Sequence, residues 1–354
     1  GRALEGNTTA SNNTAVGYQT LKVNTTGAQN VAVGNNALDA NTTASNNTAL
    51  GYFALYANTT GTQNTAVGTY CLDANTTANQ NTAVCYVALG ANSTGLSNSA
   101  VGHQVLDANT TGIRLTAFGH NALGGNTTGS NSTAIGTFAL QNNTTADSNT
   151  AVGYSAMLAN TTGTFNTAVG HEALYSNTGS NNTSLGYLAG RANTTGENNV
   201  YVGKFSGRSG TTGSGNVGVG NETFEASNTG SNNVAVGLQA LTANTSGYEN
   251  VAVGAGALVV NTTGFRNTAV GRQALDANTT GNSNVAVGYN ALSNHTQNNN
   301  IAIGYDAMKS STTGGQNTVV GDAAMRDGSG YIHCVAVGAE ALQDNSAHRN
   351  TAVG

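Results

Sequence analysis

Apolar residues recur along this chain at a fixed spacing, and the polar residues between them recur in step. The pentad Asn-(Thr/Val)-Ala-Val-Gly, or a close variant of it, starts at residue 13 and occurs 21 times up to residue 350. Seventeen of the intervals between pentads are 17 residues long, and three are 16. A constant period of this size is typical of a stacked repeat protein, so each repeat is numbered here from 1 to 17, beginning at the Asn of its pentad.

Two positions of the repeat are consistently apolar. Position 4 is aliphatic or Phe in all 21 copies, and position 9 is Leu, Met or Phe in 18 of 20. We therefore expect these two positions to form the hydrophobic core, position 4 on one side and position 9 on the other. The predicted core residues are Val16, Val33, Leu50, Val67, Val84 and Val101 at position 4, and Leu21, Leu38, Leu55 and Leu72 at position 9.

The short period limits the local structure. A repeat of 17 residues is too short for a helical hairpin but suits two strands of about five residues joined by two tight turns, since a strand rises about 3.3 Å per residue. The pentad predicts the first strand, and positions 8 to 12, such as residues 37–41, predict the second. The recurring Asn-Thr-Thr-Gly block has the side chains that favour turns.

Stacking of the repeats follows from energetics. Burying one Val and one Leu yields roughly 1.5 to 3 kcal/mol each, whereas ordering one repeat costs on the order of 17 to 34 kcal/mol in backbone entropy. A single repeat cannot fold alone, so the interfaces between repeats must supply the stability. The sequence predicts an all-β parallel β-solenoid, or β-roll, of about 20 coils, with strands about 4.7 to 4.8 Å apart and an amide ladder of position 1 Asn.

The repeats predict one continuous solenoid over residues 1–354. Its coils are less regular from about 176 to 230, where position 3 becomes Ser184, Tyr201 and Gly218 in turn and position 9 loses its Leu. We expect a local thinning or kink there. The last five residues stop within the pattern, which indicates a segment of a longer chain.

A partner is predicted by the small residues of the pentad. If position 4 faces inward, Ala at position 3 and Gly at position 5 face outward, because side chains alternate along a strand. A solvated face would vary more than these positions do. We therefore expect another copy of the chain to pack there, in a homotrimer. A monomeric solenoid is the alternative.

Composition excludes several function classes. Charged residues make up 8% of the chain and the net charge is −5, so there is no basic stripe for nucleic acid. No apolar run approaches the roughly 20 residues that span a bilayer, so no membrane insertion is expected. The three cysteines form no CxxC pair, and Cys71 and Cys85 stand where other repeats have Ala or Gly. We expect no cofactor, no metal and no enzymatic activity.

Position 6 carries the best candidate for recognition. Rings recur there, and we expect them to form an exposed edge that could stack on sugars. A metal at His103 and His120 is disfavoured, because no carboxylate or thiolate recurs beside them. The Asp residues at position 10 are expected to be solvated rather than calcium ligands. The candidate recognition residues are Tyr18, Tyr52, Tyr86, His103, His120, Tyr154 and His171.

The pentads NTAVG and NVAVG, each followed by a short apolar segment and a Gly-bearing polar turn, resemble the head repeats of trimeric autotransporter adhesins and similar arrays in phage tail fibres. The resemblance covers the chain from Asn13 onward. It implies a left-handed β-roll, three rolls packed in one trimer, and attachment at an extracellular, cell or virion surface. Our main hypothesis is a fibre shaft or adhesin-like segment acting as a rigid spacer.

Two other functions remain open. The repeated Tyr, His, Asn and Thr edge would suit binding of a glycan or a cell-surface receptor. The files of neighbouring Thr residues in the turns suggest ice binding as a minor alternative. Thr pairs adjacent in sequence do not both point outward from a strand, which weakens that hypothesis.

Overall fold

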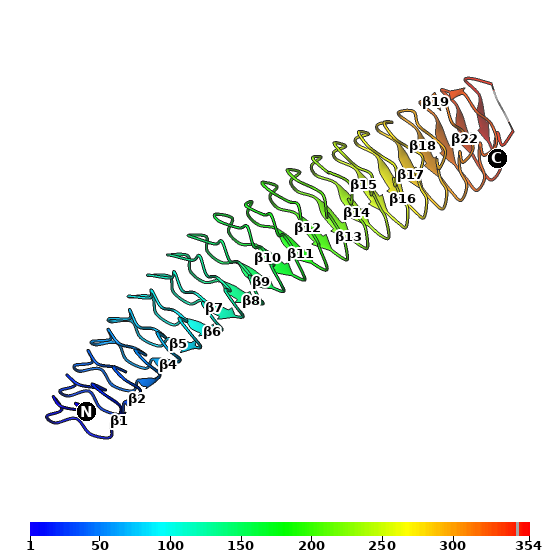
Figure 1. The fold of residues 1–354 in the computed structure, drawn as a ribbon. Helices are drawn as coiled ribbons and strands as arrows, with labels where there is room; N and C mark the ends of the chain where they lie inside the picture. The colour runs from blue at the N-terminus through cyan, green and yellow to red at the C-terminus, as the bar shows by residue number, and fades with distance from the viewer. Residues whose placement is uncertain (345–346) are drawn as a thin grey trace. The chain divides into compact units, whose positions relative to one another are not determined.

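The fold is all-β. The computed structural model describes residues 1–344 and 347–354, and no helix occurs among them. The chain divides into two compact units, residues 1–178 and 179–354, which are described separately below. In each unit the chain winds through successive coils, and each coil contributes a strand to a parallel sheet (Figure 1). The predicted parallel β-solenoid with a 17-residue period is confirmed.

The first unit contains ten strands of three residues, each covering positions 2 to 4 of its repeat. Neighbouring strands pair in parallel, and each residue lies opposite the residue one period away, as Ala49 does with Ala66. The strands are β1 (Thr14–Val16), β2 (Val31–Val33), β3 (Thr48–Leu50), β4 (Thr65–Val67), β5 (Thr82–Val84), β6 (Ser99–Val101), β7 (Thr116–Phe118), β8 (Thr133–Ile135), β9 (Thr150–Val152) and β10 (Thr167–Val169).

The second unit repeats this arrangement and adds a small two-stranded sheet, β19 with β21. The 16-residue repeat ending before β18 keeps the register, since Ala286 lies opposite Ala302. The strands are β11 (Thr183–Leu185), β12 (Val200–Val202), β13 (Val217–Val219), β14 (Val234–Val236), β15 (Val251–Val253), β16 (Thr268–Val270), β17 (Val285–Val287), β18 (Ile301–Ile303), β19 (Gly314–Gly315), β20 (Thr318–Val320), β21 (Tyr331–Ile332), β22 (Val335–Val337) and β23 (Thr351–Val353).

The prediction of two strands per coil is wrong. Positions 8 to 12 form consecutive turns instead of a strand, and the residues at positions 7 and 9 have positive φ, as at Asn36 (57°) and Leu38 (50°). A left-handed residue at every second position reverses the chain direction locally, so an extended strand cannot form. This side of the coil still bonds to its neighbours: the Leu38 N–H donates to the Ala54 carbonyl over 3.1 Å.

The predicted orientation of the pentad is also wrong, because Ala at position 3 faces inward and position 4 faces outward. Ala32 and Ala49 are fully buried, whereas Val16, Val33 and Leu50 are 58%, 37% and 36% exposed. Val67, Val84 and Val101 are half-buried. The four Leu residues predicted for position 9, Leu21, Leu38, Leu55 and Leu72, are fully buried as expected.

The size of the coil explains this reversal. The strand is three residues long and its middle residue points inward, so positions 2 and 4 must point outward. The core consists of Ala at positions 3 and 8, Leu at position 9 and buried Asn at positions 1 and 12, as the fully buried Ala49, Ala54, Leu55, Asn47 and Asn58 show. Small residues face the Leu across a thin interior. The small size of position 3 therefore reflects packing within the coil, and it no longer indicates a partner copy.

The less regular coils of the second unit are packed by compensation. Tyr201 replaces the usual Ala and is 2% exposed, and its ring occupies the space where a Cβ on Gly207 would lie, within 2.5 Å. In the next coil the order is reversed, with Gly218 on the strand and the buried Phe224 at position 9. Large and small residues thus exchange places. Strands β11 to β14 pair in register through this region.

Candidate functional site

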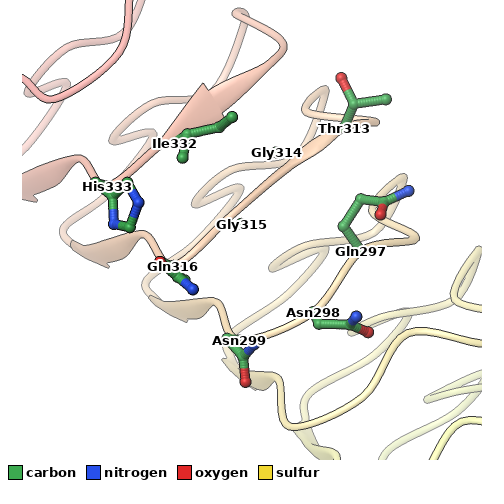
Figure 2. Close-up of a pocket in the computed structure, with 9 residues that line it drawn as sticks. All are labelled: Gln297, Asn298, Asn299, Thr313, Gly314, Gly315, Gln316, Ile332 and His333. Carbon is green, nitrogen blue, oxygen red and sulfur yellow. The ribbon is translucent and has the colours of Figure 1, made fainter.

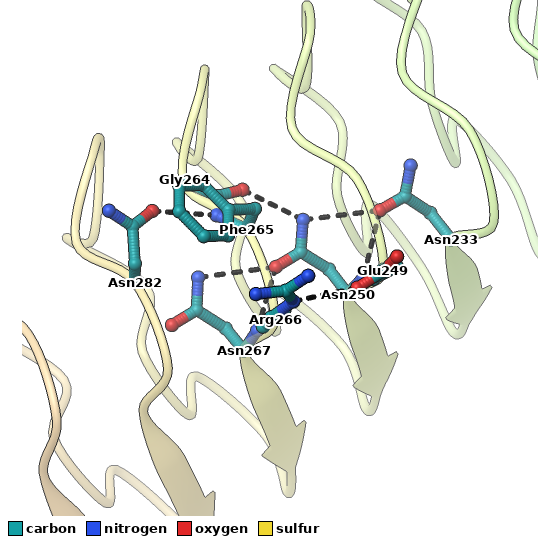
Figure 3. Close-up of polar contacts among 8 residues, drawn as sticks. All are labelled: Asn233, Glu249, Asn250, Gly264, Phe265, Arg266, Asn267 and Asn282. Carbon is teal, nitrogen blue, oxygen red and sulfur yellow. Dashed lines mark hydrogen bonds and ion pairs between the residues drawn. The ribbon is translucent and has the colours of Figure 1, made fainter.

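Two files of buried Asn run through the coils and join the turns to the strands. At position 1, the Asn250 backbone N–H and side-chain Nδ2 donate to Oδ1 of Asn233 over 3.0 and 3.1 Å, and Asn267 repeats this with Asn250. Figure 3 shows the three amides in a row, just before their strands. Asn250 Nδ2 also donates to the Gly264 carbonyl over 2.8 Å. The predicted position 1 ladder is confirmed.

The second amide file, at position 12, was expected to be turn chemistry only. Asn41 Nδ2 donates to Oδ1 of Asn24 over 2.8 Å and to the Ala44 carbonyl of its own turn over 3.1 Å. Asn30 Nδ2 donates to the same carbonyl over 2.9 Å, so both files converge on position 15. Such files satisfy buried polar groups coil by coil, and they explain why Asn is required at two positions.

In most coils the Asn that opens the Asn-x-Thr triplet at position 12 of the turn is buried. Asn24 of the triplet Asn24-Thr25-Thr26 is fully buried, and its amide nitrogen is engaged with Gly27 over 2.9 Å. The neighbouring hydroxyl of Thr25 donates to the Thr42 carbonyl of the next coil over 3.0 Å. The position 13 hydroxyls are therefore used within the stack, which weakens an ice-binding role for the turns. A thermal hysteresis assay tests that role.

The candidate recognition rings at position 6 are exposed, and they occur in short stacks. Tyr86 stacks on His103, with ring centroids 5.3 Å apart, and His103 stacks on His120 at 5.4 Å. Tyr154 stacks on His171 at 5.1 Å. The exposed members are Tyr18, Tyr52, Tyr86, His103, His120, Tyr154 and His171.

Stacking changes what these rings offer to a ligand. A ring inside a stack, such as His103, has each face against a neighbouring ring, and only its edge reaches solvent. A sugar stacks on the face of a ring, so within a file only the end members keep a face for it. Tyr52 differs, because it meets Phe53 and Tyr70 edge to face. The structure therefore reduces the predicted platform to a few ring faces.

Other titratable groups do not gather into a site. Among the described residues, no group of three or more His, Cys, Asp or Glu is placed to hold a metal ion. Asp39, Asp73 and Asp107 lie two coils apart, and partial burial raises the pKa of each carboxyl above its usual value. Burial raises the pKa of a carboxyl group because the charged form loses hydration.

The three cysteines have different surroundings. Cys71 is buried in the place of an Ala, and burial raises the pKa of its thiol to about 12. Cys334 is buried in the place of an Asn, and its N–H donates to Asn317 Oδ1 over 2.9 Å. Cys85 is exposed and replaces the Gly of position 5 at a φ of 102°. There a side chain is strained, as its neighbour Gly68 illustrates: an added Cβ would lie 2.4 Å from the Cys85 carbonyl oxygen.

An open hollow of about 460 Å³ lies near the small β19–β21 sheet. Figure 2 shows Asn299, Gln316 and His333 one beyond another just before successive strands, with Thr313 and Gln297 across the hollow. Of the nine lining residues, His333 is the only one with an ionisable side chain. The lining lacks a second group to pair with it in acid–base chemistry. Sequence reasoning did not predict this hollow, which follows from an altered turn.

The outward face of the strands is the most extended surface feature of each unit. Positions 2 and 4 carry only Thr, Ser, Val, Ile, Leu or Phe in every repeat, and none is charged. Their side chains are exposed or half-buried throughout the described strands. In the first unit a Thr-rich file at position 2 lies beside an aliphatic file at position 4. In the second unit both files are mainly aliphatic.

Among the described residues no helix has the length and apolar character needed to cross a bilayer. No protein-family model matches the chain, and no curated protein matches it either.

Proposed function

We propose that this chain is a structural shaft segment of an extracellular or viral fibre, in which stiffness is the function and no reaction is catalysed. The observation that carries the proposal is the bonding of each coil to both of its neighbours. Within one coil, Gly51 N–H donates back to the Val33 carbonyl and Thr48 N–H donates forward to the Asn64 carbonyl, both over 2.8 Å. Bending such a stack must strain hydrogen bonds at the strand and at the turns together.

The amide files support the same role. They add bonds between coils inside the core, where water cannot compete for the groups. No proline interrupts any coil, so every backbone N–H is available for bonding. A binding scaffold needs a shaped site, whereas a spacer needs a uniform cross-section. The near-constant repeat favours the spacer.

Small-angle scattering of the purified chain tests this proposal. If the two units continue one stack, 21 strands at a rise of about 4.7 to 4.8 Å predict a longest dimension near 100 Å. The control variant carries a flexible Gly-Ser linker between Thr178 and Gly179, the boundary of the two units. We expect the linker to broaden the distance distribution. A wild-type chain that scatters like the linker variant is no stiff shaft.

Recognition of a glycan or receptor is the second candidate, favoured by the exposed ring faces at the ends of the stacks. Tyr305 is 57% exposed and stacks on Tyr289 at 5.3 Å. A glycan array separates the two functions, because a pure spacer binds nothing. Binding that Tyr305→Ala and Tyr18→Ala weaken, while Thr43→Ala in an exposed turn does not, would support recognition.

A further inference from the structure

The strand face of the first unit carries a file of hydroxyl groups. Side chains at positions 2 and 4 point outward on either side of the buried Ala of position 3, as Thr65 and Val67 do beside Ala66. Over the consecutive strands β3 to β10, position 2 is always Thr or Ser, and position 4 is aliphatic or Phe. The residues with hydroxyl groups are Thr48, Thr65, Thr82, Ser99, Thr116, Thr133, Thr150 and Thr167.

The protein itself does not use these hydroxyls. None of them forms a hydrogen bond with another described residue. None is among the buried oxygen atoms that lack a partner, so solvent reaches each of them. The turn hydroxyls behave differently, since Thr59 Oγ1 donates to the Thr76 carbonyl over 3.1 Å. The hydroxyls of the strands must therefore bond to water.

The hydroxyl file is also regular. Thr65 lies opposite Thr82 and Val67 opposite Val84, and the same register continues from β3 to β10. Equivalent side chains therefore recur at the strand spacing of about 4.7 to 4.8 Å. Thr and Val are β-branched and have few χ1 rotamers, so their methyl and hydroxyl groups keep fixed places. Water that bonds to this face is held at a fixed repeat.

We propose that the strand face of the first unit binds ice. The ligand is the surface of an ice crystal, in which oxygen atoms also recur at a closely similar spacing along one axis. The proposal goes beyond the shaft function and does not depend on it. It moves the ice-binding role from the turns, where the position 13 hydroxyls are used within the stack, to the strands.

The composition of the face suits a crystal of neutral molecules. Positions 2 and 4 of the first unit carry no charged residue, and a charged side chain would keep a hydration shell of its own. Each Thr supplies a hydroxyl donor, two acceptor lone pairs and a methyl group. The hydroxyls bond to the outermost layer of ice, while the methyl and aliphatic groups bury apolar surface against it.

The length of the file lets weak contacts act together. One hydroxyl bound to ice exchanges a hydrogen bond to liquid water for another, so its net contribution is small. The strands β3 to β10 span on the order of 33 Å at the strand spacing. Their contacts form on one sheet, so the loss of translational and rotational freedom occurs once for all of them. Adsorption to ice therefore requires the file as a whole.

The test compares lysines on the strand face with lysines in the turns of the same three coils. The strand-face variant is Thr65→Lys, Thr82→Lys and Thr116→Lys. The control is Thr77→Lys, Thr94→Lys and Thr128→Lys, at exposed turn positions. Both variants add the same charge. Thermal hysteresis and inhibition of ice recrystallisation are measured with the full chain over a range of concentrations, and circular dichroism and thermal melting establish that each variant is folded.

We expect the wild type and the control to arrest ice growth below the melting point at equal concentrations. The strand-face variant should need at least a tenfold higher concentration for the same effect, because long charged side chains keep the sheet away from the crystal. Should the lysines prevent folding, Thr65→Gln, Thr82→Gln and Thr116→Gln add length without charge. That variant should show the same loss.

A folded wild type that shows neither thermal hysteresis nor inhibition of recrystallisation overturns the proposal. Equal activity of the two lysine variants overturns it as well, since the strand face would then not be the surface that binds. The shaft proposal is judged separately by scattering above the freezing point. A stiff but inactive chain contradicts only ice binding, and an active but flexible chain contradicts only the shaft.

Discussion

At the scale of single residues, His295 is the clearest departure from the repeat. It occupies the place of Asn in the position 12 file and is fully buried. Its Nδ1 lies 3.1 Å from the Ser311 carbonyl, and its Nε2 lies 2.7 Å from Asn300 Nδ2. The carbonyl can only accept, so the ring proton is assigned to Nδ1 and Nε2 accepts from the amide. Asn278 Oδ1, which the next Asn would normally reach, is buried without a partner.

Protonation of His295 should therefore destabilise the fold. Burial, which outweighs the carbonyls of Ser311 and Gly314, lowers the pKa of the imidazole in the folded chain below its ordinary value of 6.5. As pH falls through 6.5, the unfolded chain takes up a proton that the folded chain refuses, so stability decreases by up to about 1.4 kcal/mol per pH unit. We expect His295→Asn to be less sensitive to acid between pH 7 and 5, in urea unfolding at each pH. Equal slopes in both proteins would contradict this.

At the scale of the element, one coil is defined by what its strand and its turn place between them. Ala at position 3 and Leu at position 9 fill the core of most coils, and Tyr201 with Gly207 fills it in one. The sum of the two volumes matters more than either residue. This explains how the sequence departs from its pattern in the second unit while strands β11 to β14 stay in register.

A swap of this pair tests the compensation. Tyr201→Ala alone leaves a cavity and should lower the free energy of unfolding by about 3 to 5 kcal/mol. Gly207→Leu alone should also destabilise, because its Cβ would meet the Tyr201 ring. The double variant restores the common Ala and Leu pair and should recover most of the loss. Chemical denaturation of the wild type, the two single variants and the double variant gives the coupling free energy between residues 201 and 207. Additive losses would show that the two residues do not share one space.

The sequence predicted the element only in part. Period, parallel register, the Leu file and the position 1 amide ladder followed from repetition, because each requires only that equivalent residues stack. The sequence did not reveal which face of the pentad points inward, since Val is more apolar than Ala and hydrophobicity alone assigns Val to the core. In the structure the thin interior of the coil accommodates the small Ala of position 3, and the Val of position 4 points outward. The turns at positions 7 to 9 were missed because Leu at a φ near 50° is uncommon, and no residue type signals it.

At the scale of the whole molecule, the surface carries little charge. Lys, Arg, Asp and Glu make up 8% of residues, and most ion pairs among the described residues are at the surface, such as Arg208 with Glu225 at 2.9 Å. Lys309 pairs with the buried Asp306 at 3.2 Å. Surface pairs contribute about 0 to 1 kcal/mol each and are screened by salt. Stability rests on backbone, amide and apolar contacts instead.

Salt should therefore affect this fold weakly. We expect the free energy of unfolding in urea to change by less than about 1 kcal/mol between 0.05 and 0.5 M NaCl. Arg266→Gln, which breaks the pair with Glu249, serves as the control and should behave the same within that limit. A larger change in the wild type would mean that charges contribute more than their exposure indicates.

The register of one period per coil has a consequence for how such a chain can vary. Each coil contacts the coil before it and the coil after it through equivalent atoms, as Ala49 does with Ala32 and Ala66. Removing 17 consecutive residues would bring two equivalent surfaces together and leave the new junction like any other. Deletion or duplication of whole coils by recombination between near-identical gene segments would then change the reach of the molecule in fixed steps, with no redesign of its interior.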